Sequence, residues 1–185
     1  MIDDDGFILS ESHAIVEYLC KKHNCYEKWF GNSLQEQARV SEYLHWHHLN
    51  IRKACGEFLF NALLAPLFGV EEVNTHKIVH SAQNLQSCLH RFNVALSSKQ
   101  FIGGNERISV ADLSAFCELE QFCFLPQHSF AGKFPHIHRW EQDVEKQLPL
   151  SFASIHDRVL RVKDVIHKLL DNLSQDDETT EDASY

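Results

Sequence analysis

The sequence predicts an all-α fold, a bundle of amphipathic helices that is preceded by one short strand and one helix. Apolar residues recur at steps of three and four over most of the chain after residue 33. Helix-start signals open several of these stretches, whereas only Phe7 to Leu9 has the pattern of a short strand. With 185 residues, of which 44% are hydrophobic, the chain can bury one good core.

The first segment predicts a strand followed by a helix. Phe7 to Leu9 follows a turn built on Asp5-Gly6, and Ser10 or Ser12 can cap the helix that comes next. Basic residues at positions 21–23 suit the C-terminal end of that helix. No earlier strand is evident as a partner for Phe7 to Leu9, so we expect unpaired backbone on both of its sides.

Two long amphipathic helices are predicted next. The first begins near Ser33 and ends or kinks at Pro66. Its inward positions are Val40, Leu44, His47, Ile51, Cys55 and Phe58. The second begins near Glu71 and Glu72, and its apolar stripe consists of Ile78, Ala82, Leu85, Leu89, Phe92 and Leu96. The short connection at residues 68–69 predicts antiparallel packing of the pair.

The clearest local signal is the segment ISVADL at 108–113, which follows the turn FIGG at 101–104. Ser109 should be the N-cap of a helix that continues to about Phe124. The Ser109 hydroxyl can accept a hydrogen bond from the amide of Asp112, and the Asp112 carboxylate can reach back to the Ser109 amide. We therefore predict a structural capping box at Ser109 and Asp112.

Two further helices complete the predicted bundle. Pro135 occupies a suitable first helical position, with Ile137 and Trp140 turned inward. The last helix presents Ile155, Val159, Val162, Ile166, Leu169 and Leu173 at helical spacing. Residues 174–185 hold five acids, no base and no large aliphatic residue, so we expect a disordered acidic tail.

Charge and hydropathy exclude several classes of function. The formal net charge is −9 and the basic residues are scattered, so we expect no nucleic-acid partner. No stretch approaches the roughly 20 apolar residues that span a bilayer. The first residues are acidic, where a secretory signal would be basic. We expect a soluble, cytoplasmic protein with no membrane partner.

Cysteines and histidines are frequent, with six and thirteen copies. No CxxC pair occurs, so we interpret the cysteines as reduced thiols that pack as small apolar side chains, with a regulatory redox thiol as the open alternative. The segment HWHH at 45–48 places His45 and His48 on one helix face, where they could in principle bind a metal. No further ligand accompanies them at suitable spacing, so we expect no metal.

Three segments in order carry a family resemblance: DGFILSESHAI at 5–15, FIGG at 101–104 with SVAD at 109–112, and FPHIHRW at 134–140. They resemble cytosolic glutathione transferases, and EYLHW at 42–46 with IR at 51–52 is similar to the theta class. The match covers roughly residues 3–173. It implies the C-terminal helical bundle of that family at 33–173, preceded at 1–25 by a remnant of a thioredoxin-like α/β domain, its last strand and helix.

The resemblance also implies site residues. In the family, the pair that matches Glu11 and Ser12 holds the γ-glutamyl end of glutathione. A carboxylate can pair with an α-ammonium group, while a hydroxyl and the amides of a helix start can receive an α-carboxylate. From the residues alone, Ser12 can instead be a simple cap with Glu11 in the first turn. Arg52 resembles the theta-class arginine that faces the sulfur and the electrophile pocket, although a lone arginine is more often solvated or ion-paired.

For function, the resemblance implies conjugation of glutathione to small electrophiles, without a metal, by a homodimer with the helices that begin near Ser12 and Ser33 at its interface. A complete family member has a Ser or Tyr early in its N-terminal domain that donates to the glutathione sulfur. This chain begins near the last strand of that domain, so we expect it to lack most of the domain, to hold no catalytic residue and to be nearly inactive alone. The alternatives are a non-catalytic protein-interaction module and a helical bundle that binds apolar ligands.

Overall fold

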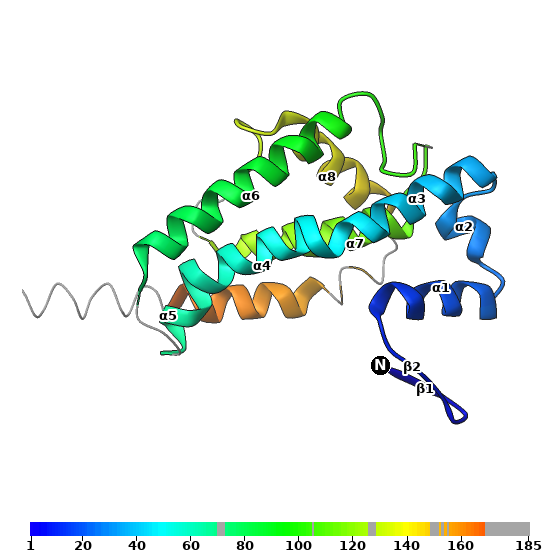
Figure 1. Cartoon of the computed structure of the whole chain (residues 1–185), viewed down its shortest axis with the longest axis horizontal. Helices are drawn as coiled ribbons and strands as arrows, with labels where there is room; N and C mark the ends of the chain where they lie inside the picture. Colours follow the sequence, from blue (N-terminus) through cyan, green and yellow to red (C-terminus); the bar gives the residue numbers. More distant parts are fainter. Residues whose placement is uncertain are drawn as a thin grey trace, which may run out of the picture.

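The computed structural model describes residues 1–69, 73–104, 106–125, 129–148, 152, 154 and 156–168. Over these ranges the chain is mostly helical and holds one two-stranded sheet near its N-terminus (Figure 1). The prediction of a mostly helical fold is confirmed. Among the described residues, no helix is long and apolar enough to cross a membrane.

The strand β2 (Phe7–Leu9) has a partner, so the expectation of an unpaired strand is wrong. It pairs antiparallel with β1 (Ile2–Asp4), with Asp3 opposite Ile8. Both residues of the turn Asp5-Gly6 have positive φ, 52° and 88°, as a tight two-residue hairpin requires. The sequence did not predict β1, because two of its three residues are aspartates and aspartate is depleted in strands.

The hairpin is attached to the helix that follows it, α1 (Ser12–Lys22). The carboxylate of Asp4 accepts hydrogen bonds from the Tyr18 hydroxyl and from the Lys22 ammonium group. The rings of Phe7 and Tyr18 lie 5.3 Å apart between centroids. A short helix that was not predicted, α2 (Tyr26–Phe30), then leads to the long helices.

The first long helix is a continuous run that begins after the N-cap Ser33 and ends at Leu67. Ser33 forms a capping box with Glu36. The run comprises α3 (Leu34–His47), the π-helical turn η1 (His48–Arg52), α4 (Lys53–Leu59), a second π-helical turn η2 (Phe60–Leu64) and α5 (Ala65–Leu67). It therefore ends one residue beyond Pro66, where the sequence predicted an end or a kink. The two π-helical turns were not predicted.

The second long helix, α6 (Thr75–Ala95), packs against α4 and runs antiparallel to it (Figure 1). The side chain of Asn74 caps α6 by accepting from the Lys77 amide at 3.0 Å. The predicted start near Glu71 and Glu72 lies outside the described residues.

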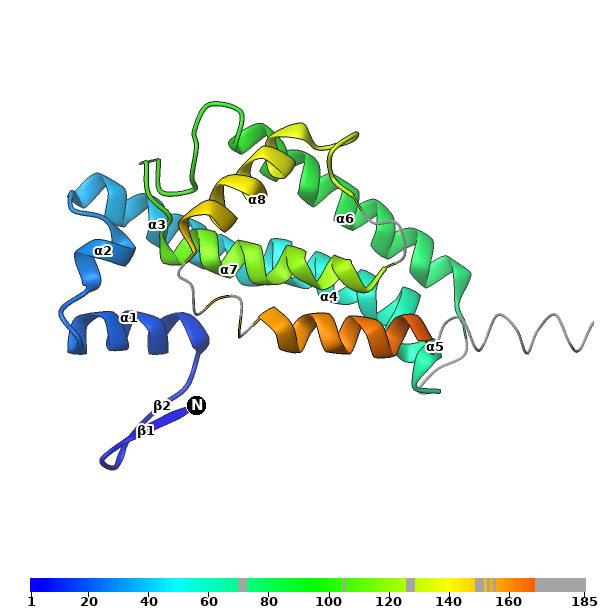
Figure 2. The same ribbon diagram turned by 180° about the vertical axis from the view of Figure 1, so that it is seen from behind.

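Helix α7 (Val110–Leu119) is the buried centre of the bundle and continues into a 3₁₀ turn, η3 (Glu120–Phe124). Figure 2 shows α7 across the middle of the bundle, in front of α3 and α4, with α8 (Pro135–Gln147) above it. Both inward residues predicted for α8, Ile137 and Trp140, are fully buried.

Asp112 connects three segments around the start of α7. Its side chain is fully buried. Oδ2 accepts from the amide of Ser109 at 2.9 Å and from its hydroxyl at 2.6 Å, and the structure has a capping box between these two residues. Oδ1 accepts from the Ile102 amide at 2.8 Å and from Trp140 Nε1 at 2.9 Å. One carboxylate thus joins the 101–104 turn, α7 and α8.

Residues 156–168 form a further helical segment. Ile166 is buried, but Val162 is 49% exposed, so its predicted inward position is wrong. The predicted core residues Ile155, Leu169 and Leu173 and the predicted tail at 174–185 lie outside the described residues.

Candidate functional site

The N-terminal end of α1 carries the first candidate residues, Glu11 and Ser12, and both are exposed. Glu11 is the N-cap residue and has φ 70° and ψ 114°, on the side of backbone space that favours glycine. Non-glycine residues in such sparsely populated regions cost about 1–3 kcal/mol and cluster at ligand sites. The backbone carbonyl of Glu11 accepts from the amide of Ile15 at 2.9 Å, which closes the first turn.

No side chain caps α1, so the prediction that Ser10 or Ser12 caps it is wrong. The positive φ of Glu11 explains this, because an N-cap residue whose side chain caps normally has extended backbone angles. The early amides of a helix have no intrahelical acceptor. With no capping side chain, this helix end is open to an anionic ligand group.

Arg52, the third candidate, lies on the bundle at the end of η1. Its Nη1 donates to Oε1 of Glu118 on α7 at 2.9 Å. The Arg52 side chain is 58% exposed and that of Glu118 only 9%, so a buried carboxylate holds one edge of an accessible cation. Gln121 Nε2 donates to the other oxygen of Glu118 at 2.9 Å.

Glu118 also faces His47, which is buried, with 3.5 Å between Oε1 and Nε2. Burial alone would raise the pKa of Glu118, but the hydrogen bond with His47 and the charge of Arg52 outweigh burial and lower that pKa. Glu118 is therefore a stable anion that orients Arg52.

His13 joins the helix end to this charged pair. Its ring centroid lies 5.0 Å from that of His47 and 4.4 Å from that of His48. Burial, followed by the charges of His47 and His48, lowers the pKa of His13 to about 4. His13 is thus neutral near pH 7 and packs α1 against α3 and η1. Ser12 directly precedes His13 in the sequence, and His13 contacts His47, which faces the Arg52–Glu118 pair. Ser12 and Arg52 therefore belong to one region of the structure.

Ser109 and Asp112 do not belong to this region. Both are buried at the start of α7, and their hydrogen bonds are made to the protein itself. Their role in the structure is to hold the turn, α7 and α8 together.

Sequence reasoning missed His13, His47 and Glu118 as members of the candidate region. The HWHH segment was the only hint, and it pointed to a metal. In the structure His45 Nδ1 lies 2.8 Å from the Ser41 carbonyl oxygen, while His47 turns inward to Glu118. Over the ranges that the structure describes, no group of three or more His, Cys, Asp or Glu residues could hold a metal ion.

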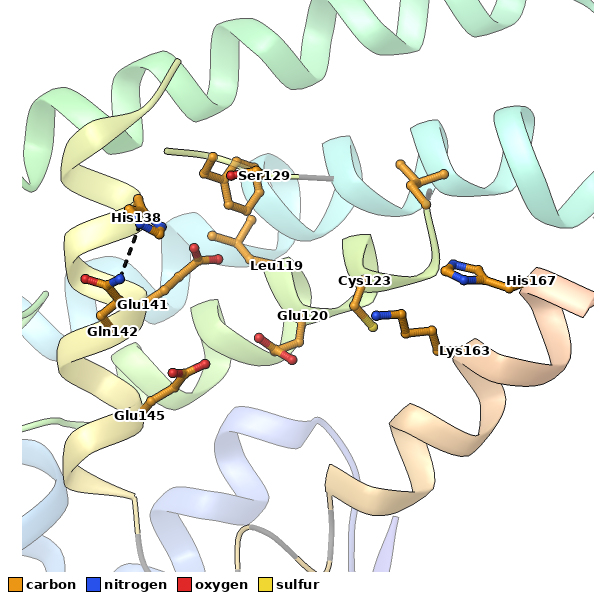
Figure 3. Close-up of a pocket in the computed structure, with 12 residues that line it drawn as sticks. Leu119, Glu120, Cys123, Ser129, His138, Glu141, Gln142, Glu145, Lys163 and His167 are labelled. Carbon is orange, nitrogen blue, oxygen red and sulfur yellow. Dashed lines mark hydrogen bonds between the residues drawn. The ribbon is translucent and has the colours of Figure 1, made fainter. Parts of the chain in front are cut away.

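A second, acidic pocket of about 530 Å³ lies between η3, α8 and the 156–168 helix. Figure 3 shows Glu120, Glu141 and Glu145 facing the same space, with Lys163 on the opposite side. Burial, followed by the charges of Glu120 and Glu145, raises the pKa of Glu141 to about 8. Among the described lining residues, three acidic side chains face only one lysine, so this pocket suits an anionic ligand less well than the open end of α1.

What the candidate region can do follows from its parts. An uncapped helix end and a hydroxyl can receive a carboxylate, the exposed Glu11 carboxylate can pair with an ammonium group, and Arg52 supplies an oriented cation. These groups together fit a ligand that carries an α-amino-acid end and a second anionic centre.

No family model matches the chain, but individual proteins are similar to it over most of its length. Glutathione S-transferase theta-1 of Gallus gallus is 32% identical over 173 residues, which are 92% of this chain and 66% of that protein. Glutathione S-transferase theta-3 of Mus musculus is 32% identical over 166 residues, covering 89% of this chain and 68% of that protein. The chain thus spans about two thirds of the length of these relatives.

Solved structures give the same result. The crystal structure of human glutathione transferase theta-2, in complex with glutathione and an unknown ligand, matches with a TM-score of 0.78 at 32% identity. The matched part covers 90% of this chain and 68% of that one.

Proposed function

We propose, since this chain belongs to the theta-class glutathione S-transferases, that it binds glutathione at the N-terminal end of α1 and that its activity is conjugation of glutathione to small electrophiles. The observation that carries this proposal is the uncapped end of α1, which His13 and His47 connect to the Arg52–Glu118 pair. The complex of the theta-2 relative with glutathione supports the identity of the ligand.

Glu11 and Ser12 bind the γ-glutamyl end of the tripeptide in this proposal. The Glu11 carboxylate pairs with the α-ammonium group, and the Ser12 hydroxyl with the open amides of α1 receives the α-carboxylate. The unusual backbone conformation of Glu11 supports this role, because such strain gathers at ligand sites. Both side chains are exposed, so a ligand can reach them.

Arg52 stabilises the glutathione thiolate or the electrophile. A fixed cation near a thiol favours the thiolate, which is the nucleophile. Glu118 holds one edge of the guanidinium group, and the exposed part can face a ligand. In the reaction the glutathione thiol loses its proton to solvent and its sulfur forms a bond to an electrophilic carbon. In a substitution the bond from that carbon to the leaving group breaks and the group departs with the electron pair, and in an addition a π bond of the electrophile breaks and its other atom takes up a proton. Neither reaction needs a metal.

We assign no hydroxyl of this chain the role of donor to the glutathione sulfur. Residues 1–25 correspond in this proposal to the end of a thioredoxin-like domain, and residues 33–173 to the helical domain.

We also propose a cytoplasmic homodimer. The six free cysteines are in keeping with a reducing compartment. The helices that begin near Ser12 and Ser33 contribute to the interface. The second of these helices, α3, also lines a pocket of about 370 Å³ that it shares with α6, with Tyr43, Trp46 and Phe92 in the lining. Light scattering on the purified chain at several concentrations tests this part of the proposal.

Glutathione binding by titration calorimetry tests the central claim. Loss of the Ser12 hydroxyl in Ser12→Ala should weaken binding about 3- to 10-fold, the effect of one neutral hydrogen bond. Glu11→Ala removes a charge-assisted contact and should weaken binding about 10- to 100-fold. The matched controls are Glu27→Ala and Ser98→Ala, at exposed positions outside the N-terminal end of α1. Equal affinities for all four variants would contradict the assignment.

A further inference from the structure

The C-terminal end of α1 forms a Schellman motif. After the cap residue His23 the chain passes through Asn24 with φ 53°, in the left-handed region. The amide of Cys25 donates to the Cys20 carbonyl at 2.9 Å, and the amide of Asn24 donates to the Lys21 carbonyl at 3.2 Å. These are the two nested hydrogen bonds that define the motif.

A Schellman motif brings two side chains together, one from the last full turn of the helix and one from just beyond it. In most proteins this contact is between apolar residues, but here both positions are cysteines, Cys20 and Cys25. Burial, followed by the charge of and the hydrogen bond with the neighbouring Cys25 thiol, raises the pKa of Cys20 to about 11, so the two thiols lie close together. Both sulfurs are reduced in the structure.

The two thiols differ in access to solvent. Cys20 is buried and Cys25 is half-buried, at the N-cap position of α2. A reagent can therefore reach Cys25 first, with Cys20 directly behind it. The other near pair, Cys55 and Cys88, is buried at both positions, and burial raises the pKa of both thiols. That pair offers a reagent no accessible sulfur.

We propose that Cys20 and Cys25 are a redox-active dithiol that small disulfides convert reversibly into an intramolecular disulfide across the end of α1. The backbone hydrogen bond between the two residues fixes their separation in the native state, which a disulfide requires. This modification site goes beyond glutathione conjugation and does not depend on it.

The reaction takes two exchange steps. The Cys25 thiolate, its proton lost to water, attacks one sulfur of a disulfide RSSR and expels one thiolate RS⁻. The Cys20 thiolate then attacks the Cys25 sulfur of the mixed disulfide and expels the second RS⁻. In total two protein thiols are oxidised to one disulfide, RSSR is reduced to two RSH, and a thiol in excess reverses both steps.

The disulfide would fasten the end of α1 to the start of α2. Ser12 and His13 lie at the other end of the same helix, so the bond constrains the helix that carries the proposed ligand site. Opening of the turn at 23–25 would be suppressed in the oxidised chain and allowed in the reduced one.

The test is equilibration of the folded chain in buffers of 2-hydroxyethyl disulfide and 2-mercaptoethanol, a neutral pair that does not involve glutathione binding. Acid quenching, alkylation and tryptic mapping identify the bond, because cleavage after Lys21 and Lys22 separates the two cysteines. We expect a Cys20–Cys25 disulfide that forms at an RSSR concentration about tenfold lower than in the same chain unfolded in urea.

Three variants complete the experiment. Cys25→Ser should abolish the linked peptide, and Cys20→Ser should stop the reaction at the mixed disulfide on Cys25. The control Cys117→Ser, at an exposed position on α7, should leave the disulfide unchanged. Circular dichroism checks that each variant folds, and Cys20→Ala replaces Cys20→Ser if the hydroxyl is not tolerated. Half-oxidation at the same RSSR concentration in folded and unfolded chains, or a disulfide that forms only between molecules through Cys117, would overturn the proposal.

Discussion

Removal of the Asp112 carboxylate should be among the most destabilising single changes to this fold. The carboxylate is fully buried and accepts hydrogen bonds from four donors that belong to the 101–104 turn, the start of α7 and α8. In Asp112→Ala the Ser109 hydroxyl can rotate toward another acceptor. The amides of Ile102 and Ser109 and the indole N–H of Trp140 lose their acceptor and stay buried.

The magnitude follows from these three donors. Each buried donor left without a partner costs about 1–3 kcal/mol, and partial entry of water makes the sum less than additive. We expect a loss of about 4 kcal/mol in the free energy of unfolding, a large part of the roughly 5–15 kcal/mol of a typical domain. With a slope of about 2 kcal/mol per molar urea, the midpoint should fall by about 2 M.

Urea titrations followed by circular dichroism measure this shift. The matched control is Trp140→Phe, which removes one donor and leaves three on a buried carboxylate, so its midpoint should fall by about 0.5–1 M. A midpoint for Asp112→Ala within about 0.5 M of the wild type would refute the reasoning, because the carboxylate would then not be the shared acceptor of the three segments.

Three further predictions concern charged groups. Glu118→Ala removes the hydrogen-bond partner of the Arg52 guanidinium group and leaves His47 without its carboxylate. We expect a loss of about 1–3 kcal/mol in the free energy of unfolding, measured by urea titration. An unchanged free energy would contradict the role of Glu118 in holding Arg52. The pKa of His13 is lowered to about 4, so the unfolded chain binds the extra proton between about pH 6.5 and 4 and stability falls as pH falls through that window. After a discount for solvent screening the fall should be about 1 kcal/mol, and His13→Phe should remove it from the pH profile of thermal unfolding. The pKa of Glu141 is raised to about 8, so the native chain binds the extra proton and stability falls as pH rises from about 4.5 to 8. Glu141→Gln should reduce this fall in the free energy of unfolding by about 1–3 kcal/mol. An unchanged slope of stability against pH would contradict the raised pKa of Glu141.

Much of the bundle could be predicted because its signals are local. The steps of three and four give the long helices, and Pro135 marks the start of α8. Elements whose signals conflict with their surroundings could not be predicted. β1 is rich in aspartate, and its formation depends on the Asp5-Gly6 turn, whose conformation overrides the weak strand propensity of its neighbours.

The candidate region was predictable only in part. The sequence contains Glu11 and Ser12 as neighbours, but it gives no sign that the helix end stays uncapped, since that depends on the backbone conformation of Glu11. Arg52 and Glu118 are 66 positions apart, and only tertiary packing brings them within 2.9 Å. An acidic residue in a helix normally faces solvent, so nothing local marked Glu118 as buried.

The two π-helical turns determine which way the long helix faces along its length. One row of its buried residues lies at steps of four: His47, Ile51, Cys55, Leu59 and Leu63. In an ideal α-helix each step of four overshoots a full turn by about 40°, so the stripe would rotate by about 160° and leave the core before residue 63. A π turn holds about one more residue than an α turn, so the two turns together can take up the rotation of about 160°. The same effect aims Arg52, because a deletion of one residue inside η1 would turn every side chain after it by about 100°. An alignment of this helix with an uninterrupted one therefore needs a one-residue gap at η1 and another at η2, because each missing gap compares later positions with ones about 100° away around the helix axis.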